Sequence, residues 1–368
     1  MSEVYNHQPR QVGVDVQRRI NALGIGQKMQ DLPEELWHES FRFYVKEDPT
    51  RKGGPNLRII RLDPNQPSLT VTGYIFNKFV HPYENRFITP REAARLQGFP
   101  DNLEFKGTLT SVQRQVGDAV PVELGQAVFT SLLNHFSTNW PHQKTFCALS
   151  LFSGAGGLDI GAEQAKGKNS NRLKTFACVE IETDRCDTLR EYFGERVRVF
   201  NHDITTIDSE FVLNSCQMSF NNVWLLYGGP PCQSFSQAGK QKGTGDPRGK
   251  LIFEFLRFVG EILPPFFVME NVANLKGINK GKLLDEILSE IDKLGYNVDY
   301  RILNAAQYGN PQKRRRYIFL GSKKELAMAK LPDPTHSEKA NLFGLPQFKT
   351  VGEAFAFLPS PDYEPVQV

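Results

Sequence analysis

Cys232 stands on a stiffened turn and is the residue of this chain best suited to act as a nucleophile. It follows the apolar run 223–227 and the sequence Gly-Gly-Pro-Pro at 228–231. Glycine permits a tight turn and a close backbone approach, and each proline fixes φ and removes a donor. A cysteine that only fills a core needs no such turn, whereas a nucleophile must be held in position. The pattern therefore predicts a reactive thiol at the end of a buried strand.

Apolar runs and helical patterns alternate along the second half of the chain. This alternation predicts an α/β fold with a doubly wound, mostly parallel sheet. The expected strands are residues 146–152, 173–180, 197–200, 223–227, 266–272, 298–303 and 316–321. Helical patterns lie between several of them, at residues 184–193, 250–262 and 282–294.

The polar residues of interest follow the ends of these strands. A glycine-rich loop, 152–157, follows the first, and Glu180, Asp203, Cys232 and Glu270 end or follow the next four. Ligands bind such sheets at the carboxyl ends of the strands, so these residues should meet in one crevice. The loop and Glu180 alone also fit a dinucleotide site, which keeps an NAD-dependent dehydrogenase open. A thiol and a carboxylic acid beside a nucleotide site favour group transfer instead.

The composition is that of an ordinary soluble globular protein. Of 368 residues, 40% are hydrophobic and 23% charged, and the formal net charge is +3. Five cysteines without a CxxC pair argue against a disulfide framework or a zinc finger and fit a reducing compartment. No apolar run approaches the roughly 20 residues that span a bilayer, and the N-terminus has no apolar signal region. We therefore expect a cytoplasmic protein with no metal site and no membrane partner.

Six segments of the chain together resemble the cytosine carbon-5 DNA methyltransferases. The resemblance covers most of residues 56–358 and implies an S-adenosylmethionine-dependent methyltransferase fold. It also implies S-adenosylmethionine as the methyl donor, S-adenosylhomocysteine as the product and double-stranded DNA as the partner. The segments are residues 151–157, 230–233, 269–272, 312–316, 89–101 and 114–121.

The resemblance assigns roles to individual residues. Cys232 would add to carbon-6 of the base, Glu270 would contact the ring nitrogen, and Arg314 and Arg316 would hold the nucleotide. In the cofactor pocket, Phe152 and Ile181 would flank the adenine, Glu180 would take the ribose hydroxyls and Asp203 the adenine amino group. The remaining cofactor residues would be Ser153, Gly154, Gly156, Gly157, Ile204, Gly229, Pro231, Leu251, Asp118, Ala119 and Val120.

The order of the segments is unusual and resembles a circular permutation of the family. The segments at 89–101 and 114–121 usually come last, but here they precede a helix at 122–136 and a polar linker at 137–144. Thr89, Pro90 and Glu92 predict a capped helix start. We expect a recognition region and small domain at 1–88, helix-rich motifs with the linker at 89–145 and a catalytic domain at 146–330. Residues 331–368 would lead back to the recognition region.

Target recognition should lie within residues 1–88 and a loop after Cys232. Residues 42–61 are rich in basic side chains, and we expect Arg58 and Arg61 to contact phosphates. Thr70 would lie near the target nucleotide. Ser236 and Gln237 would contact DNA, and Gln237 would pair with the guanine left behind when the cytosine leaves the helix. Asp118 stands where the family usually has Asn, and we expect this carboxylate to alter cofactor binding modestly.

The sequence leaves two other functions open. A related branch methylates cytosine in transfer RNA, and a catalytically silent DNA-binding subunit would share the fold. The retention of Cys232, Glu270, Arg314 and Arg316 argues against the silent subunit. We expect a monomeric, site-specific DNA methyltransferase of a bacterial restriction–modification system, with a cognate restriction endonuclease as a further candidate partner.

Overall fold

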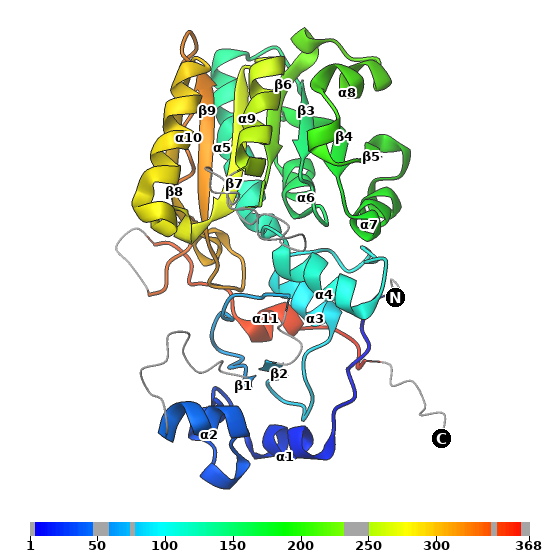
Figure 1. Cartoon of the computed structure of the whole chain (residues 1–368), viewed down its shortest axis with the longest axis vertical. Coiled ribbons are helices and arrows are strands. Elements are labelled where there is room, and N and C mark those ends of the chain that lie inside the picture. Colours follow the sequence, from blue (N-terminus) through cyan, green and yellow to red (C-terminus); the bar gives the residue numbers. More distant parts are fainter. Residues whose placement is uncertain (1–3, 47–58, 74–77, 232–249, 340–343, 362–368) are drawn as a thin grey trace, which may run out of the picture.

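The computed structural model describes residues 4–46, 59–73, 78–231, 250–339 and 344–361 of the chain. These residues form two parts, which lie one above the other in Figure 1. The upper part is a sheet with helices on both faces. The lower part is built from residues that precede the helix α5 (Val122–Asn139), together with the short C-terminal helix α11 (Val351–Phe355).

The central sheet has seven strands in the order β5-β4-β3-β6-β7-β9-β8. The neighbours among β3 to β7 pair in parallel, whereas β9 runs antiparallel to both β7 and β8. All seven predicted apolar runs overlap these strands, so the doubly wound, mostly parallel α/β fold is confirmed. The strands are β3 (Thr145–Leu151), β4 (Arg172–Glu180), β5 (Arg198–Asn201), β6 (Val223–Gly228), β7 (Phe266–Val272), β8 (Tyr296–Asn304) and β9 (Arg315–Lys323).

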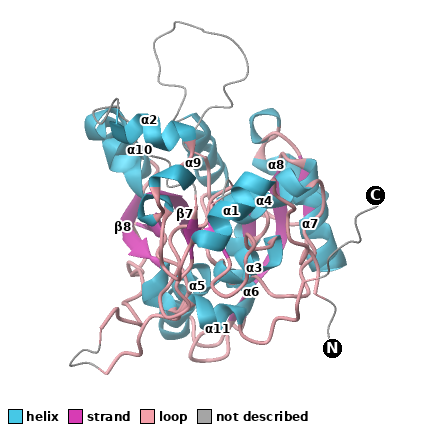
Figure 2. Cartoon of the chain, turned by 90° about the horizontal axis from the view of Figure 1, so that it is seen from below, coloured by secondary structure: helices cyan, strands magenta, loops and turns pink. Residues whose placement is uncertain are grey.

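Helices bury both faces of the sheet, which explains why its strands read as continuous apolar runs. Leu226 joins the core beneath α9 and α10, while its neighbours Leu225 and Tyr227 point to the opposite face, beneath α5 and α6. Figure 2 shows these two pairs of helices on opposite sides of the strands. The helices of this part are α6 (Gly157–Gln164), α7 (Thr183–Phe193), α8 (Ser209–Ser215), α9 (Lys250–Ile262) and α10 (Lys282–Lys293).

The lower part contains short elements with their own apolar core. The predicted helix start at Thr89 is confirmed, because the Thr89 hydroxyl accepts from Glu92 N and the Glu92 carboxylate accepts from Thr89 N. The elements are α1 (Val14–Ala22), α2 (Glu39–Lys46), β1 (Ile60–Arg61), β2 (Phe79–Val80), α3 (Pro90–Leu96) and α4 (Leu109–Asp118). Short 3₁₀ turns lie at Met29–Asp31, Glu34–Leu36, Gly194–Arg196, Ile204–Thr206, Phe220–Asn222, Ala273–Gly281 and Ala305–Tyr308.

The connection from α5 to β3 is shorter than the predicted linker 137–144. The helix continues to Asn139, as Trp140 N still donates to Phe136 O at 2.8 Å, and the Ser137 side chain is buried. Near the two ends of the chain, His7 Nε2 lies 2.9 Å from Pro359 O, so segments about 350 residues apart in sequence are neighbours. Within the described ranges, no helix is both long and apolar enough to cross a membrane.

Candidate active site

Glu270 lies near the end of β7, is buried, and forms an ion pair with a partly buried arginine. Its side chain carries Oε1 at 2.7 Å from Arg316 Nε on the neighbouring strand β9. The register pairs Glu270 with Ile318, two residues from Arg316, so the two charged side chains share one face of the sheet. Burial raises the pKa of the Glu270 carboxyl, although the charges of Arg316 and Arg314 act in the opposite direction. This carboxyl therefore holds a proton to a higher pH than an ordinary glutamate.

The turn before Cys232 is fixed against β7. A Cβ on Gly228 would lie 2.0 Å from Leu151 O, so this position requires glycine, and one on Gly229 would lie 2.9 Å from Glu270 Oε2 and displace that carboxyl. Asn271 Nδ2 donates to Pro230 O at 3.0 Å, and Pro231 is exposed. The backbone that leads to the predicted nucleophile is thus tied to the strand that carries Glu270.

The predicted residues Cys232, Ser236 and Gln237 lie outside the described residues. Asn271, which the sequence-based assignment omitted, holds the turn that precedes them. Asn271 directly follows Glu270 within the segment 269–272, and this position could have indicated that it belongs to the site.

Arg314 is buried, and its Nε has no hydrogen-bond partner among the described residues. Its side chain is 1% exposed, and its guanidinium donates to Val71 O and Gly117 O. Burial, with a contribution from the charge of Arg316, lowers the pKa of Arg314 to about 9. Arg314 therefore holds two segments of the lower part to the sheet, and its contact with the nucleotide stays a prediction.

Gln312 joins the same parts of the molecule and was also missed from the sequence. Its amide oxygen accepts from Val71 N, and Nε2 donates to Leu96 O and to the Gln97 side chain. The residue is fully buried. A glutamine that leads a segment of four basic residues reads as part of a solvated run, and only the fold reveals that it faces inward.

The glycine-rich loop makes a close turn between β3 and α6. Gly154 and Gly156 have φ values of +57° and +85°, which glycine adopts without strain. Phe152 also has a positive φ, +52°, which is uncommon for a residue with a side chain. A Cβ on Gly157 would lie 2.1 Å from Val120 O, so the segment that contains Ala119 and Val120 packs directly on the loop. Ser153 is held by a 2.8 Å hydrogen bond between its hydroxyl and that of Ser150.

Glu180 ends β4 and is fixed by three backbone N–H groups. Oε2 accepts from Gly154 N at 2.8 Å, and Oε1 accepts from Ile181 N and Glu182 N at 2.9 Å. A carboxylate offers about four acceptor sites, so it can still take a hydroxyl. Because the loop is packed so closely and a carboxylate borders it, these residues fit a nucleoside cofactor with ribose hydroxyls.

The other predicted cofactor residues lie around this loop and the next strand end. Asp203 follows β5, and its Oδ1 accepts from Thr205 N at 2.9 Å. Ile181 is 43% exposed, whereas Ile204 is 4% exposed. Phe152 and Leu251 are partly buried against the core of the sheet. Asp118 ends α4 and forms an ion pair with Arg185 of α7.

Arg61 is not available for the predicted phosphate contact. Its side chain is 4% exposed, and its guanidinium donates to the carbonyl oxygens of Ile20, Leu23 and His81 among others. Arg58 lies outside the described residues. Thr70 lies beside the segment that contains Arg314, because its hydroxyl donates to Lys313 O at 2.9 Å.

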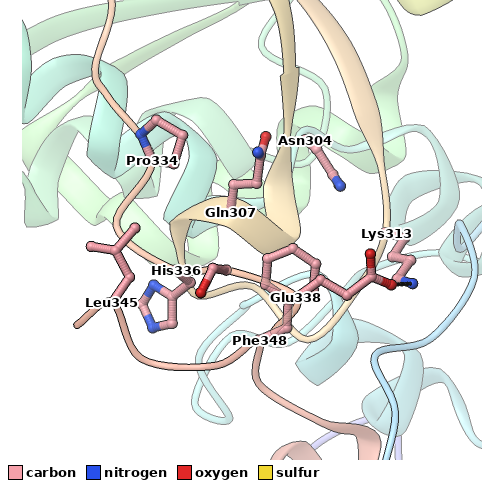
Figure 3. Close-up of a pocket in the computed structure, with 9 residues that line it drawn as sticks. Asn304, Gln307, Lys313, Pro334, His336, Glu338, Leu345 and Phe348 are labelled. Atoms are coloured by element: carbon pink, nitrogen blue, oxygen red, sulfur yellow. Dashed lines mark hydrogen bonds and ion pairs between the residues drawn. The ribbon is translucent and has the colours of Figure 1, made fainter. Parts of the chain in front are cut away.

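A cavity of about 440 Å³ lies beyond Lys313, at the end of β8 (Figure 3). Asn304, Gln307 and Phe348 contribute to its wall, and the ion pair between Lys313 Nζ and Glu338 Oε1, at 2.5 Å, closes one side. None of the predicted site residues lines it. Nowhere in the described ranges do three or more His, Cys, Asp or Glu side chains gather in a way that would hold a metal ion.

Comparison with known proteins gives one family over most of the chain. Residues 5–134 and 146–358 match the family described as C-5 cytosine-specific DNA methylase. The chain is 40% identical over 226 residues to the type II methyltransferase M.AquIA of a Picosynechococcus species, with 57% of this chain and 88% of that protein covered. It is 39% identical over 213 residues to the type II methyltransferase M1.HphI of Haemophilus parahaemolyticus, with 57% and 52% covered. It thus spans most of the first relative and about half of the second.

Proposed function

The chain belongs to the C-5 cytosine-specific DNA methylase family, and we propose that it transfers a methyl group from S-adenosylmethionine to carbon-5 of cytosine in duplex DNA. The observation that carries this proposal is the ion pair of Glu270 and Arg316 beside the clamped Pro230 carbonyl. This arrangement brings a proton-holding carboxyl to the same sheet edge as the turn that precedes Cys232. It suits an attack on a ring carbon assisted by protonation of a ring nitrogen.

Carbon-5 of cytosine is a poor nucleophile, and the proposed residues change that. The Cys232 thiolate forms a bond to carbon-6 while Glu270 gives or shares a proton with the ring nitrogen, so that carbon-5 gains electron density. Arg316 orients the carboxyl of Glu270 through the 2.7 Å contact. S-adenosylmethionine, when bound, supplies the methyl group as an electrophile. Loss of the carbon-5 proton to a base and return of the ring-nitrogen proton to Glu270 then let the thiolate leave carbon-6 and restore the aromatic ring.

The glycine loop and the two carboxylates support the choice of cofactor. We assign the ribose hydroxyls to Glu180 and the adenine amino group to Asp203, because both carboxylates lie at the carboxyl ends of adjacent parallel strands. The exposed Ile181 side chain suits a contact with the adenine ring, opposite Phe152.

Adding a single methyl group to the glycine loop by substitution tests whether the cofactor binds there. Gly157→Ala would set a Cβ against Val120 O and push the loop away from residues 119 and 120. We expect the affinity for S-adenosylhomocysteine, measured by calorimetry, to fall by about tenfold or more. Gly13→Ala is the control, because nothing lies within 4 Å of its Cβ position. Equal affinities in the two variants would contradict the assignment of this loop to the cofactor.

The reaction requires the target cytosine to leave the duplex, since stacking covers carbon-5 and carbon-6. The assay offers the purified protein labelled S-adenosylmethionine with either duplex DNA or transfer RNA. We expect label in DNA alone, an increase in fluorescence from a base analogue at the target position, and one sequence context by bisulfite sequencing. Label in transfer RNA alone would support the RNA methyltransferase, and no label in either would support a silent DNA-binding subunit.

We also propose that the order of segments is a circular permutation. Two observations support it. The helix α5 packs on α6 and leads into β3 through only five residues, 140–144. At the other end of the order, His7 lies beside Pro359. Gly161 makes this packing close, because a Cβ there would lie 2.8 Å from Val122 O. We further propose that the protein acts as a monomer in the bacterial cytoplasm, beside a cognate restriction endonuclease.

A further inference from the structure

Asp118 and Arg185 form an ion pair at the rim of the glycine loop. Asp118 ends α4, and Arg185 lies in the first turn of α7, 67 residues further along the chain. Arg185 Nη2 donates to Asp118 Oδ2 at 2.8 Å, and the Arg185 and Asp118 side chains are 21% and 57% exposed. The pair joins the lower part of the molecule to the helix that follows β4, and solvent reaches it.

Arg185 also lies close to the loop. Its Nη1 lies 4.0 Å from the position of a Cβ on Gly154, the residue whose N–H donates to Glu180. Two residues after Asp118, the carbonyl of Val120 packs on Gly157 at the other end of the loop. Glu180 and the ion pair therefore border the same short segment of backbone. A cofactor that binds against this loop with its ribose at Glu180 lies close to the ion pair of Asp118 and Arg185.

Without Arg185, the charges at this rim would oppose the carboxylate of such a cofactor. Beyond its ribose, S-adenosylhomocysteine carries an amino-acid end with one carboxylate and one ammonium group. Glu180 and Asp118 already place two carboxylates beside the loop, and a third at close range would be repelled. Two like charges about 5 Å apart change a binding constant by roughly 4-fold when water screens them fully, and by more where the protein lowers the dielectric constant. A guanidinium held against Asp118 removes most of that repulsion.

We propose that Arg185 determines the affinity for the amino-acid end of the cofactor by neutralising Asp118. The proposal rests on the function proposed above, because it takes S-adenosylmethionine to be the molecule that fills the loop. Arg185 acts here as a positioning and charge-compensating residue, since its role runs through the carboxylate of Asp118.

The test compares two ligands by calorimetry with the full-length protein at low ionic strength. S-adenosylhomocysteine has the amino-acid end, and 5′-methylthioadenosine lacks it. We expect Arg185→Ala to weaken S-adenosylhomocysteine by about 3- to 10-fold, an effect that shrinks as added salt screens the exposed charges. The affinity for 5′-methylthioadenosine should stay within about twofold of the wild type.

The decisive variant removes both charges. Adding Asp118→Asn to Arg185→Ala should restore S-adenosylhomocysteine binding to within about twofold of the wild type. Arg190→Ala is the matched control, because Arg190 forms an ion pair of 2.8 Å with Asp187 on the same helix. It should change neither affinity.

Three outcomes would overturn the proposal: no effect of Arg185→Ala, an equal loss for both ligands, or no restoration in the double variant. A wild-type protein that binds neither ligand would instead overturn the proposed cofactor, and the inference with it.

Discussion

The Cys232→Ala protein should transfer no measurable methyl group to DNA, although it should bind S-adenosylhomocysteine as the wild type does. In the proposed mechanism the thiol acts on the base, whereas Glu180, Asp203 and the glycine loop bind the cofactor. Loss of a nucleophile removes the whole covalent route, so the single-turnover rate should fall by more than about 10⁴-fold. Rapid-quench measurements with labelled cofactor give the rate, and calorimetry gives the affinity.

Cys216→Ala is the matched control for this loss. Cys216 is a free, half-buried cysteine directly after α8, away from the carboxyl ends of the strands. That variant should keep the wild-type rate. A folded Cys232→Ala protein that has lost cofactor affinity, or that still methylates DNA, would remove Cys232 from its proposed role.

The Glu270→Gln protein should methylate DNA about 10²- to 10⁴-fold more slowly, the range that a positioned acid contributes. The amide keeps the size of the side chain but cannot give up a proton to the ring nitrogen. Because burial raises the pKa of Glu270, its protonated fraction falls only as the pH rises through this raised value. The wild-type single-turnover rate should therefore have a component that decreases with rising pH, and the variant should lack it.

The alternative for Glu270 is a purely structural role as the partner of Arg316. Arg316→Lys separates the two, since it keeps a cation opposite the carboxyl while it loses the oriented Nε–H. If Glu270→Gln retained a wild-type rate with an unchanged pH profile, the carboxyl would not be the acid. A variant that simply unfolds is recognised by circular dichroism and by loss of S-adenosylhomocysteine binding.

The sheet and most of its strand ends were predictable because they depend on local pattern. Apolar runs bounded by Gly, Pro and Asp fix where strands end, and parallel strands must end at one edge of the sheet. Glu180, Asp203 and Glu270 therefore had to lie there. The capped start of α3 was likewise predictable, because it depends on Thr89, Pro90 and Glu92, which lie within four residues.

The failures concern side chains whose partners are distant in sequence. Arg61 lies in a basic stretch, which suggests exposure to solvent. In the fold it lies in β1, which pairs with β2 over only two residues. Carbonyl groups of the surrounding segments accept its guanidinium N–H groups. The hydrogen bond from Arg314 to Val71 O, 243 residues away, was likewise not foreseen. Arg185 gave no signal at all, because only the folded chain brings it to Asp118.

The position of α5 before β3 sets the order in which the molecule can assemble during translation. Phe129, Leu132 and Phe136 of α5 are fully buried, and they pack on residues of α6, β3 and β6 that follow them in the chain. About 140 residues thus leave the ribosome before the first strand of the sheet exists. Their apolar surface stays exposed until α6, β3 and β6 have been synthesised. Exposed apolar surface of this kind favours aggregation and binding by chaperones. Slowing the ribosome just after α5 should lower the yield of soluble protein more than slowing it after β7.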